Sequence, residues 1–151
     1  TVARTYRMAI DDYFENPDKY RENIPKYKKL ISQCTYRQYT TGFFFGKPDE
    51  TTQIYDANVY ERDYVYLGIV GDETAPLEYL LEQKNKFYVG ETIEIMKPDG
   101  ENVEVTVKRI INEEGEDQES APHSKQVLYI ELEGGQASPY DILRRQEPEV
   151  Q

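Results

Sequence analysis

The chain of 151 residues is long enough for one domain with a buried core and an appended segment. Aromatic residues make up 13% of it, which argues against intrinsic disorder, and its single cysteine, Cys34, excludes an internal disulfide and a Cys-rich metal site. No apolar run is long enough to span a membrane and no signal peptide is visible, so we expect a cytoplasmic location and no membrane partner.

The net charge of -11 is unevenly distributed along the chain. Residues 1–47 carry nine basic and five acidic side chains, whereas residues 48–151 carry nine basic and 24 acidic ones. Acidic side chains repel a phosphate backbone, so nucleic acid is not an expected partner of the second part. The basic first part keeps an RNA contact open, although it has no dense Lys/Arg stripe. Because the chain starts at Thr1 instead of Met, we expect a piece of a longer protein.

Apolar residues at three- and four-residue intervals predict a helix over residues 2–14. Asn16 and Pro17 end this helix, and the same pair is suited to cap a further turn. We expect a short helix over residues 18–21 and a separate one over residues 26–32, because a second proline lies between them and proline interrupts a helix.

Four tyrosines in this region are spaced by seven residues: Tyr6, Tyr13, Tyr20 and Tyr27. Such spacing is typical of a coiled-coil seam, which needs a continuous helix. Pro17 and Pro25 interrupt the segment. Coincidence is therefore the preferred interpretation of the spacing.

From Cys34 onward the pattern changes to short segments rich in aromatic and β-branched residues, bounded by Gly, Pro and Asn. Residues 35–46 are interpreted as extended chain that enters this second region. The predicted strands cover residues 64–70, 77–83, 87–96 with a bend at Gly90, 103–107, 127–132 and a last segment from Ile142. Residues 77–83 are ambiguous between helix and strand, and their shortness favours a strand.

Turn residues separate these strands at regular intervals. Residues 97–100 (Lys-Pro-Asp-Gly) predict a tight turn, and residues 112–120 predict an acidic turn. Short strands about ten residues apart predict a mainly β fold, a small antiparallel β-barrel preceded by a short α-helical segment. The strand order cannot be read from the sequence.

His123 is the only histidine, and a hydrolase would use it as a base beside Ser120 or Ser124. No third group that would orient such a pair is apparent, so a histidine in a loop is the favoured interpretation. The acidic run over residues 113–119 lacks the ligand spacing of an EF-hand and is interpreted as a solvated hairpin tip. Cys34 has no neighbouring base that would activate its thiol. We assign no catalytic and no metal-binding residue.

An aromatic-rich segment over residues 43–64 is the candidate contact surface. Its aromatic side chains suit either the core of the barrel or an interface with another domain. In extended chain successive side chains point to opposite sides, so three consecutive Phe do not all face one core. The candidate interdomain or substrate-contact residues are Phe43, Phe44, Phe45, Tyr55, Tyr60 and Arg62.

The same segment carries a family resemblance. Four segments resemble the C-terminal domain of the U32 peptidase family, also described as collagenase-like peptidases: residues 39–64, 83–95, 121–123 and 139–144. Residues 1–35 resemble the connector that follows the catalytic domain in this family, with Tyr6-Arg7 in an AYR-like helix. The resemblance implies a helical connector over residues 1–35, a barrel domain over residues 36–145 and a tail over residues 146–151.

The resemblance also implies a partner, a larger N-terminal catalytic domain similar to an α/β barrel. Cysteine ligands of this family, linked in some members to an iron–sulfur cluster, belong to that domain, and Cys34 matches none of their motifs. Some members resemble peptidases or collagenases that act on protein substrates, and others are implicated in tRNA uridine hydroxylation.

We expect this chain by itself to be a non-catalytic accessory domain of a U32 peptidase, a hydrolase, for interdomain docking or substrate presentation. One alternative is the same role in a tRNA uridine hydroxylation enzyme, and another is an autonomous hydrolase that uses His123. A weaker resemblance links residues 89–95, in which Val-Gly-Glu precedes an alternating strand, to the barrel of the second domain of elongation factor Tu. The final strand at Ile142-Leu143 agrees with it.

Overall fold

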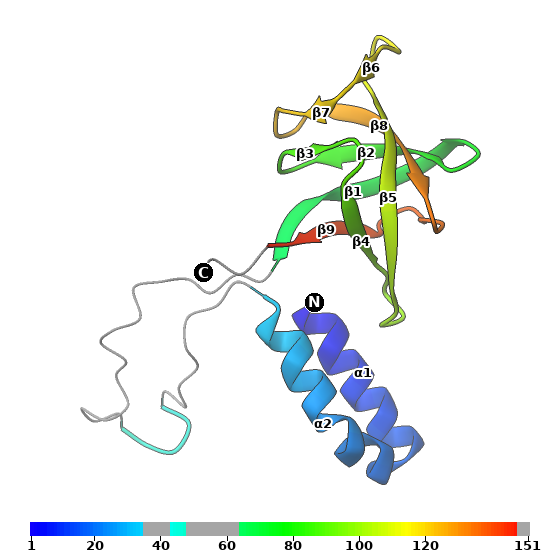
Figure 1. The fold of residues 1–151 in the computed structure, drawn as a ribbon. Helices are drawn as coiled ribbons and strands as arrows, with labels where there is room; N and C mark the ends of the chain where they lie inside the picture. The colour runs from blue at the N-terminus through cyan, green and yellow to red at the C-terminus, as the bar shows by residue number, and fades with distance from the viewer. Residues whose placement is uncertain (35–42, 48–63, 148–151) are drawn as a thin grey trace. The chain divides into compact units, whose positions relative to one another are not determined.

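The computed structural model describes residues 1–34, 43–47 and 64–147. It divides into two compact units, Thr1–Asp63 and Tyr64–Gln151, which we describe separately. Figure 1 shows the helices of the first unit in blue and the strands of the second in green to red. The predicted start of the barrel domain, residue 36, and the tail from residue 148 lie outside the described residues.

Two packed helices make up the first unit, α1 (Val2–Glu15) and α2 (Pro17–Ser32). Asn16 joins them in an extended conformation, and its side chain accepts a hydrogen bond from the backbone N–H of Asp18 at 2.9 Å. This cap satisfies one of the amides that a helix start leaves unpaired. Neither helix is both long and apolar enough to cross a membrane.

The prediction of two separate helices after residue 17 is wrong. Helix α2 runs without a break through Pro25, whose side chain is exposed. A proline removes one helical hydrogen bond, but packing of the apolar face of a helix outweighs such a local preference. Tyr27, two residues further on, is only 6% exposed and supplies part of that packing.

Three of the four tyrosines spaced by seven meet at the turn between the helices. The rings of Tyr13 and Tyr20 lie edge to face with centroids 5.7 Å apart, and those of Tyr20 and Tyr27 are stacked at 5.9 Å. The rejection of a coiled-coil seam is confirmed, because the chain reverses at Asn16 and brings α1 against α2. The contacts of the three rings belong to the packing of this helical pair.

A hydrogen-bonded carboxylate joins the two helices near these rings. Tyr27 donates its hydroxyl to Asp12 at 2.5 Å, Asn23 donates its amide at 2.9 Å, and the ammonium of Lys19 lies 2.9 Å away. The hydrogen bond from Tyr27, followed by that from Lys19, lowers the pKa of Asp12 to about 2. Burial, helped by the hydrogen bond to Asp12, raises the pKa of Tyr27 to about 12.

Acidification is expected to loosen this helical pair through Asp12. Its pKa is lower in the folded than in the unfolded chain, so its stabilising effect is complete above about pH 4 and is lost as the pH falls through about 2. Asp12→Asn should remove this part of the acid response in the helical circular dichroism signal. The matched control is Asp11→Asn, because Asp11 is exposed and only pairs with Arg7. Equal acid responses in the two variants would contradict the expectation.

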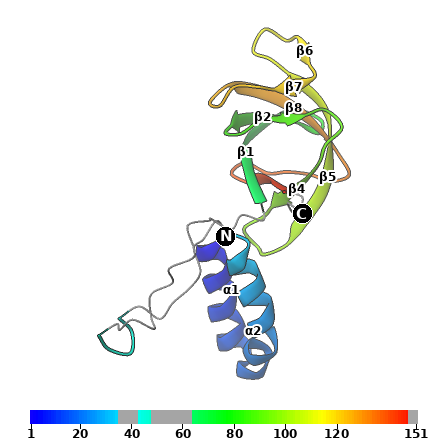
Figure 2. The same cartoon turned by 60° about the vertical axis from the view of Figure 1, so that its left-hand side comes forward.

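The second unit is a closed antiparallel barrel (Figures 1 and 2). Six strands follow one another around it in the order β4, β9, β1, β2, β8, β5, and β5 pairs with β4 to close the ring. Their bounds are β1 (Tyr64–Ala75), β2 (Glu78–Gln83), β4 (Thr92–Met96), β5 (Asn102–Ile111), β8 (Val127–Glu133) and β9 (Ile142–Gln146). The expected mainly β fold, a small antiparallel barrel preceded by α-helices, is confirmed.

Three short strands lie outside the ring. β6 (Asp117–Gln118) extends the sheet beside β5, whereas β3 (Phe87–Tyr88) and β7 (Ser120–Ala121) form a separate two-stranded sheet. The predicted strand over residues 87–96 is thus divided in two, because Gly90 bends the chain with a φ of +85°. The predicted acidic turn over residues 112–120 contains β6 and the first residue of β7.

Alternating residues of the six strands fill the barrel interior, as period-two patterns require. In β5, for example, Val105 and Val107 are buried while Glu104 and Lys108 are exposed. The fully buried side chains of the interior include Leu67, Tyr79, Leu81, Phe87, Ile95, Val107, Ile110, Leu128, Ile130 and Leu143. Because the ring is closed, it leaves no unpaired strand edge among these six strands.

Several local predictions agree with the barrel. The ambiguous segment over residues 77–83 is a strand from Glu78, and the tight turn is present with Gly100 at a φ of +95°. The strand predicted over residues 64–70 is longer, because β1 continues to Ala75 through irregular pairing with β2. The last strand ends at Gln146, one residue beyond the predicted boundary of the barrel.

Candidate functional site

His123 lies in the exposed loop between β7 and β8. Its backbone carbonyl accepts a hydrogen bond from the N–H of Gln126 at 3.3 Å, which closes a turn. The structure shows no hydrogen bond from either candidate hydroxyl, Ser120 or Ser124, to its side chain within the described part of the chain. The loop interpretation of His123 is confirmed, and the autonomous hydrolase has no assembled nucleophile and base in these residues.

The remaining candidate ligands do not converge. Within residues 1–34, 43–47 and 64–147 there is no group of three or more His, Cys, Asp or Glu side chains placed to hold a metal ion. Cys34, half-buried just after α2, is a free thiol. The acidic residues over 113–119 surround a tight turn in which Gly115 has a φ of +81°.

The three consecutive phenylalanines are almost fully exposed. Phe43, Phe44 and Phe45 have exposed fractions of 80%, 83% and 81%. They lie in a turn that the hydrogen bond from Gly46 N–H to Phe43 C=O closes at 3.2 Å, so extended chain is the wrong prediction here. The other candidate contact residues, Tyr55, Tyr60 and Arg62, lie outside the described residues, and the contact role of this segment stays a prediction.

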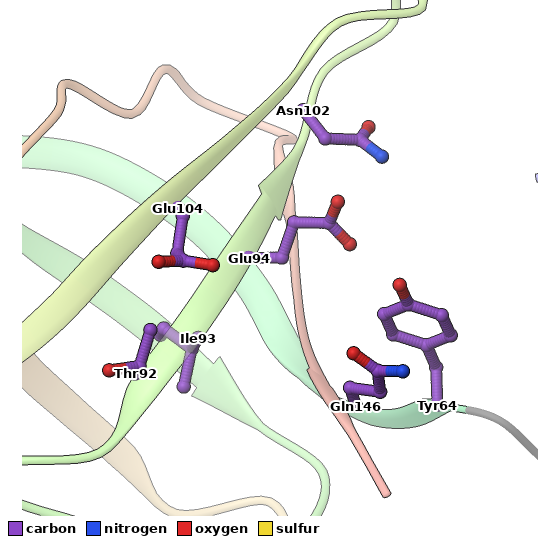
Figure 3. Close-up of a pocket in the computed structure, with 7 residues that line it drawn as sticks. All are labelled: Tyr64, Thr92, Ile93, Glu94, Asn102, Glu104 and Gln146. Atoms are coloured by element: carbon purple, nitrogen blue, oxygen red, sulfur yellow. The ribbon is translucent and has the colours of Figure 1, made fainter.

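A polar hollow of about 280 Å³ on the barrel is a candidate binding site that the sequence did not indicate (Figure 3). It lies over β4 and β5, beside the first residue of β1 and the last residue of β9. Its lining consists of Tyr64, Thr92, Ile93, Glu94, Asn102, Glu104 and Gln146. The antiparallel register brings the lining together, because Glu94 pairs directly with Glu104 and Met96 pairs with Asn102.

Arg144 organises one side of this hollow. It is 4% exposed, and its Nε donates to Glu94 Oε2 at 2.6 Å. Its guanidinium carbon lies 3.9 Å from the centroid of the Tyr64 ring, a cation–π contact. Like charges directly opposite on neighbouring strands repel each other, so Arg144 compensates for the closeness of Glu94 to Glu104.

The hollow presents hydrogen-bonding groups to a ligand. Carboxylate and amide oxygens from Glu94, Glu104, Asn102 and Gln146 accept hydrogen bonds, which matches a cationic or donor-rich group. The lining contains no Cys, His or Lys, and its ionisable side chains are Tyr64, Glu94 and Glu104. The geometry of the described residues therefore provides a candidate binding site on a small barrel.

The fold is that of a small closed antiparallel β-barrel preceded by two helices. Comparison with protein families makes the assignment specific. The model of the Peptidase family U32 C-terminal domain matches residues 62–144, and that of Peptidase family U32 matches residues 1–54. The chain belongs to peptidase family U32 and contains its C-terminal domain, as the sequence resemblance predicted.

Two curated proteins are similar to the chain over most of its length. The tRNA hydroxylation protein P1 of Bacillus subtilis (strain 168) is 27% identical over 134 residues, which are 88% of this chain and 32% of that protein. The tRNA hydroxylation protein P of Escherichia coli (strain K12) is 27% identical over 146 residues, which are 95% of this chain and 31% of that protein. The chain thus spans about a third of the length of these curated relatives.

Two solved structures are also similar to part of the chain. Two crystal structures of the C-terminal domain of a U32 peptidase from Geobacillus thermoleovorans, one of them a selenomethionine variant, share 24% sequence identity and a TM-score of 0.48 with the chain. They cover 54% and 55% of this chain, and the alignments include 99% and 92% of theirs.

Proposed function

We propose that this chain is the non-catalytic C-terminal part of a U32-family protein that takes part in tRNA hydroxylation. The observation that carries the proposal is the similarity over 88% and 95% of the chain to two relatives named for that process. The described residues supply no assembled nucleophile, base or metal cluster, which supports an accessory role. A tRNA-modifying protein works in the cytoplasm, so we propose that location as well.

Interdomain docking is the role that the exposed apolar side chains support. Along α1, Val2, Tyr6, Ile10 and Phe14 are exposed by 45%, 61%, 48% and 83%. Their spacing of four residues places them on one side of the helix. We propose that this side and the exposed rings of residues 43–45 contact the rest of the U32 polypeptide. The threefold greater length of the relatives and the match of residues 1–54 to the general U32 model support this partner.

Burial would make such a contact favourable. Covering one exposed Val, Ile or Phe side chain contributes about 1.5–3 kcal/mol, and α1 offers three of them, Val2, Ile10 and Phe14. The contact does not require the barrel to bind substrate. Substrate presentation would instead use the hollow beside Glu94 and Arg144, whose oxygen-rich lining suits a cationic group of a protein.

Peptidase activity of the full-length protein is the second candidate, and the family description supports it. The two candidates predict different products. A tRNA-hydroxylating protein changes the nucleoside composition of tRNA, whereas a peptidase releases peptides from a protein such as gelatin or casein. In both cases we expect the 151-residue chain alone to be inactive.

The deciding experiment uses cells that lack the full-length protein. Reintroducing that protein should restore hydroxylated uridine in tRNA, measured by mass spectrometry of nucleosides, and a version without this chain should not restore it. Ile10→Glu, on the proposed contact side of α1, should lower the hydroxylated fraction by about tenfold, because a buried unpaired charge costs at least about 1.4 kcal/mol. The matched control is Glu22→Gln on exposed α2 surface. Gelatin cleavage without any change in tRNA would refute the proposal.

A further inference from the structure

A lysine–aromatic surface lies at one end of the barrel, around β3 and β7. We define it by Tyr66, Lys84, Lys86, Tyr88 and Lys125. Tyr66 and Tyr88 are 38% and 45% exposed, whereas Tyr79 of the same barrel is fully buried. Four of the five large apolar side chains that are exposed in the described barrel lie here or directly beside it: Tyr66, Tyr88, Val89 and Val127.

Hydrogen bonds and a cation–π contact link the segments that carry these residues. The backbone N–H of Lys84 donates to Leu67 C=O at 2.8 Å, and the side-chain amide of Asn85 donates to Tyr66 C=O at 2.7 Å. The Lys86 ammonium lies 4.7 Å from the centroid of the Tyr88 ring. The backbone N–H of Lys125 donates to Gln83 C=O at 2.8 Å, beside Lys84. Figure 1 shows the paired strands β3 and β7 next to each other.

The charge of this surface differs from that of the barrel around it. Residues 64–147 carry eight basic and 18 acidic side chains, a net charge of -10. The two segments that supply four of its five residues, 83–90 and 120–130, carry three lysines and no Asp or Glu. The residues that flank the two segments are all glutamates, Glu82, Glu91, Glu119 and Glu131, and Glu82 forms an ion pair with Lys84. The other two lysines, Lys86 and Lys125, form no ion pair with a carboxylate of the described residues.

We propose that the lysine–aromatic surface binds a single-stranded segment of RNA, such as a loop or an end of tRNA. This inference rests on the proposed function and adds a substrate contact to it. Single-stranded nucleic acids are bound where aromatic rings stack on bases and neighbouring cations neutralise phosphates. Tyr88 and Tyr66 supply exposed rings, and Lys86 and Lys125 supply the cations.

The negative charge of the rest of the barrel repels RNA, which weakens this contact without abolishing it. Exposed charges more than about 8 Å apart are largely screened at physiological salt, so a local group of lysines acts over the length of a few nucleotides. An acidic protein segment would use the lysines but has less use for exposed tyrosine rings, whereas every nucleobase stacks on them. RNA is therefore the occupant that uses both exposed tyrosines together with Lys86 and Lys125.

The test measures binding of the 151-residue chain to a fluorescein-labelled single-stranded RNA of mixed sequence by fluorescence anisotropy. The double variant K86Q/K125Q should bind about tenfold more weakly at about 50 mM salt, and its salt dependence should be shallower by about 1.4 in log–log slope, since each neutralised phosphate contributes about 0.7. Tyr88→Ala should also bind about tenfold more weakly, with an unchanged slope, because it removes stacking and no charge.

The matched control is K108Q/R109Q, which removes two cations from β5 of the same barrel. Lys108 and Arg109 pair with Glu131 and Asp117, and we expect RNA affinity to change less than twofold. K86R/K125R should retain wild-type affinity. Circular dichroism of each variant verifies that the barrel remains folded.

Three results would overturn the inference: no RNA binding by the wild-type chain, equal losses in K86Q/K125Q and K108Q/R109Q, or tight binding of an oligoglutamate peptide in place of RNA. These outcomes differ from failure of the proposed function. If the full-length protein restores tRNA hydroxylation and K86Q/K125Q binds RNA normally, only the surface assignment is wrong. If RNA binding requires the surface but no hydroxylation is found, only the proposed function is wrong.

Discussion

Gln83→Glu is expected to lower the free energy of unfolding of the barrel by about 3–5 kcal/mol at pH 7, the cost of an uncompensated buried charge. The Gln83 side chain has no exposed surface, and its Nε2 donates to the carbonyl oxygens of Ala121 and, at 3.2 Å, Asn85. An ionised carboxylate has no proton to donate, so it would face two carbonyl oxygens without compensation. The hydrogen bonds from Gln83, at the end of β2, to Ala121 of β7 and to Asn85 in the loop after β2 would be lost.

The effect should depend on pH in a defined direction. Burial raises the pKa of the introduced carboxyl above its unfolded value of about 4.3, so stability is lost as the pH rises from about 4 and partly recovers on acidification. Urea denaturation at about pH 4.5 and about pH 7 measures this difference. The matched control is Gln136→Glu, the same change on an exposed loop, with an expected effect within about 0.5 kcal/mol. A loss that does not vary with pH would indicate a packing defect instead of a buried charge.

Phe87→Ala is expected to destabilise the barrel by about 3–5 kcal/mol and to detach the small sheet of β3 and β7. Phe87 has no exposed surface and packs in the core, and its register partner Ala121 is equally buried. The sheet has only two residues in each strand, so burial of these side chains is its main attachment. Removing the ring leaves a cavity that the surrounding strands fill only in part.

The neighbouring Tyr88→Ala provides the control, because that ring points to solvent and should cost less than about 1 kcal/mol. Urea denaturation gives the free energies, and hydrogen exchange shows where protection is lost. The amide of Val89, which donates to Glu119 C=O, should exchange earliest in the Phe87 variant. Equal losses in the two variants would contradict the assignment of Phe87 as the attachment of this sheet.

The same sheet connects stability with the proposed RNA contact. Lys86 and Tyr88 lie on either side of Phe87, so a buried ring positions a cation and an exposed ring. The negative net charge of residues 48–151 predicts that this part of the chain does not bind nucleic acid. The net charge of a segment does not, however, describe how its charged side chains are distributed over the surface. The absence of carboxylates from residues 83–90 and 120–130 could be read from the sequence, whereas the proximity of these segments could not.

Local patterns were sufficient for the type of most elements. The alternation at Val103, Val105 and Val107 predicts a half-buried strand because neighbouring side chains of a strand point to opposite faces, and β5 has this pattern. The helix over residues 2–14 follows from its apolar spacing in the same way. The family resemblance also depends on residues that are contiguous in the chain, so it needed no tertiary information.

The tertiary structure decided what depends on partners distant in sequence. It pairs Glu94 with Glu104 and places Arg144 beside Glu94, although Glu94 and Arg144 are 50 residues apart in the chain. It also keeps α2 continuous through Pro25, because packing against α1 outweighs one missing hydrogen bond. Strand order and the clusters of side chains depend on how the strands pack around one shared core. The free energy of that packing depends on the whole barrel, so no single segment of the sequence determines it.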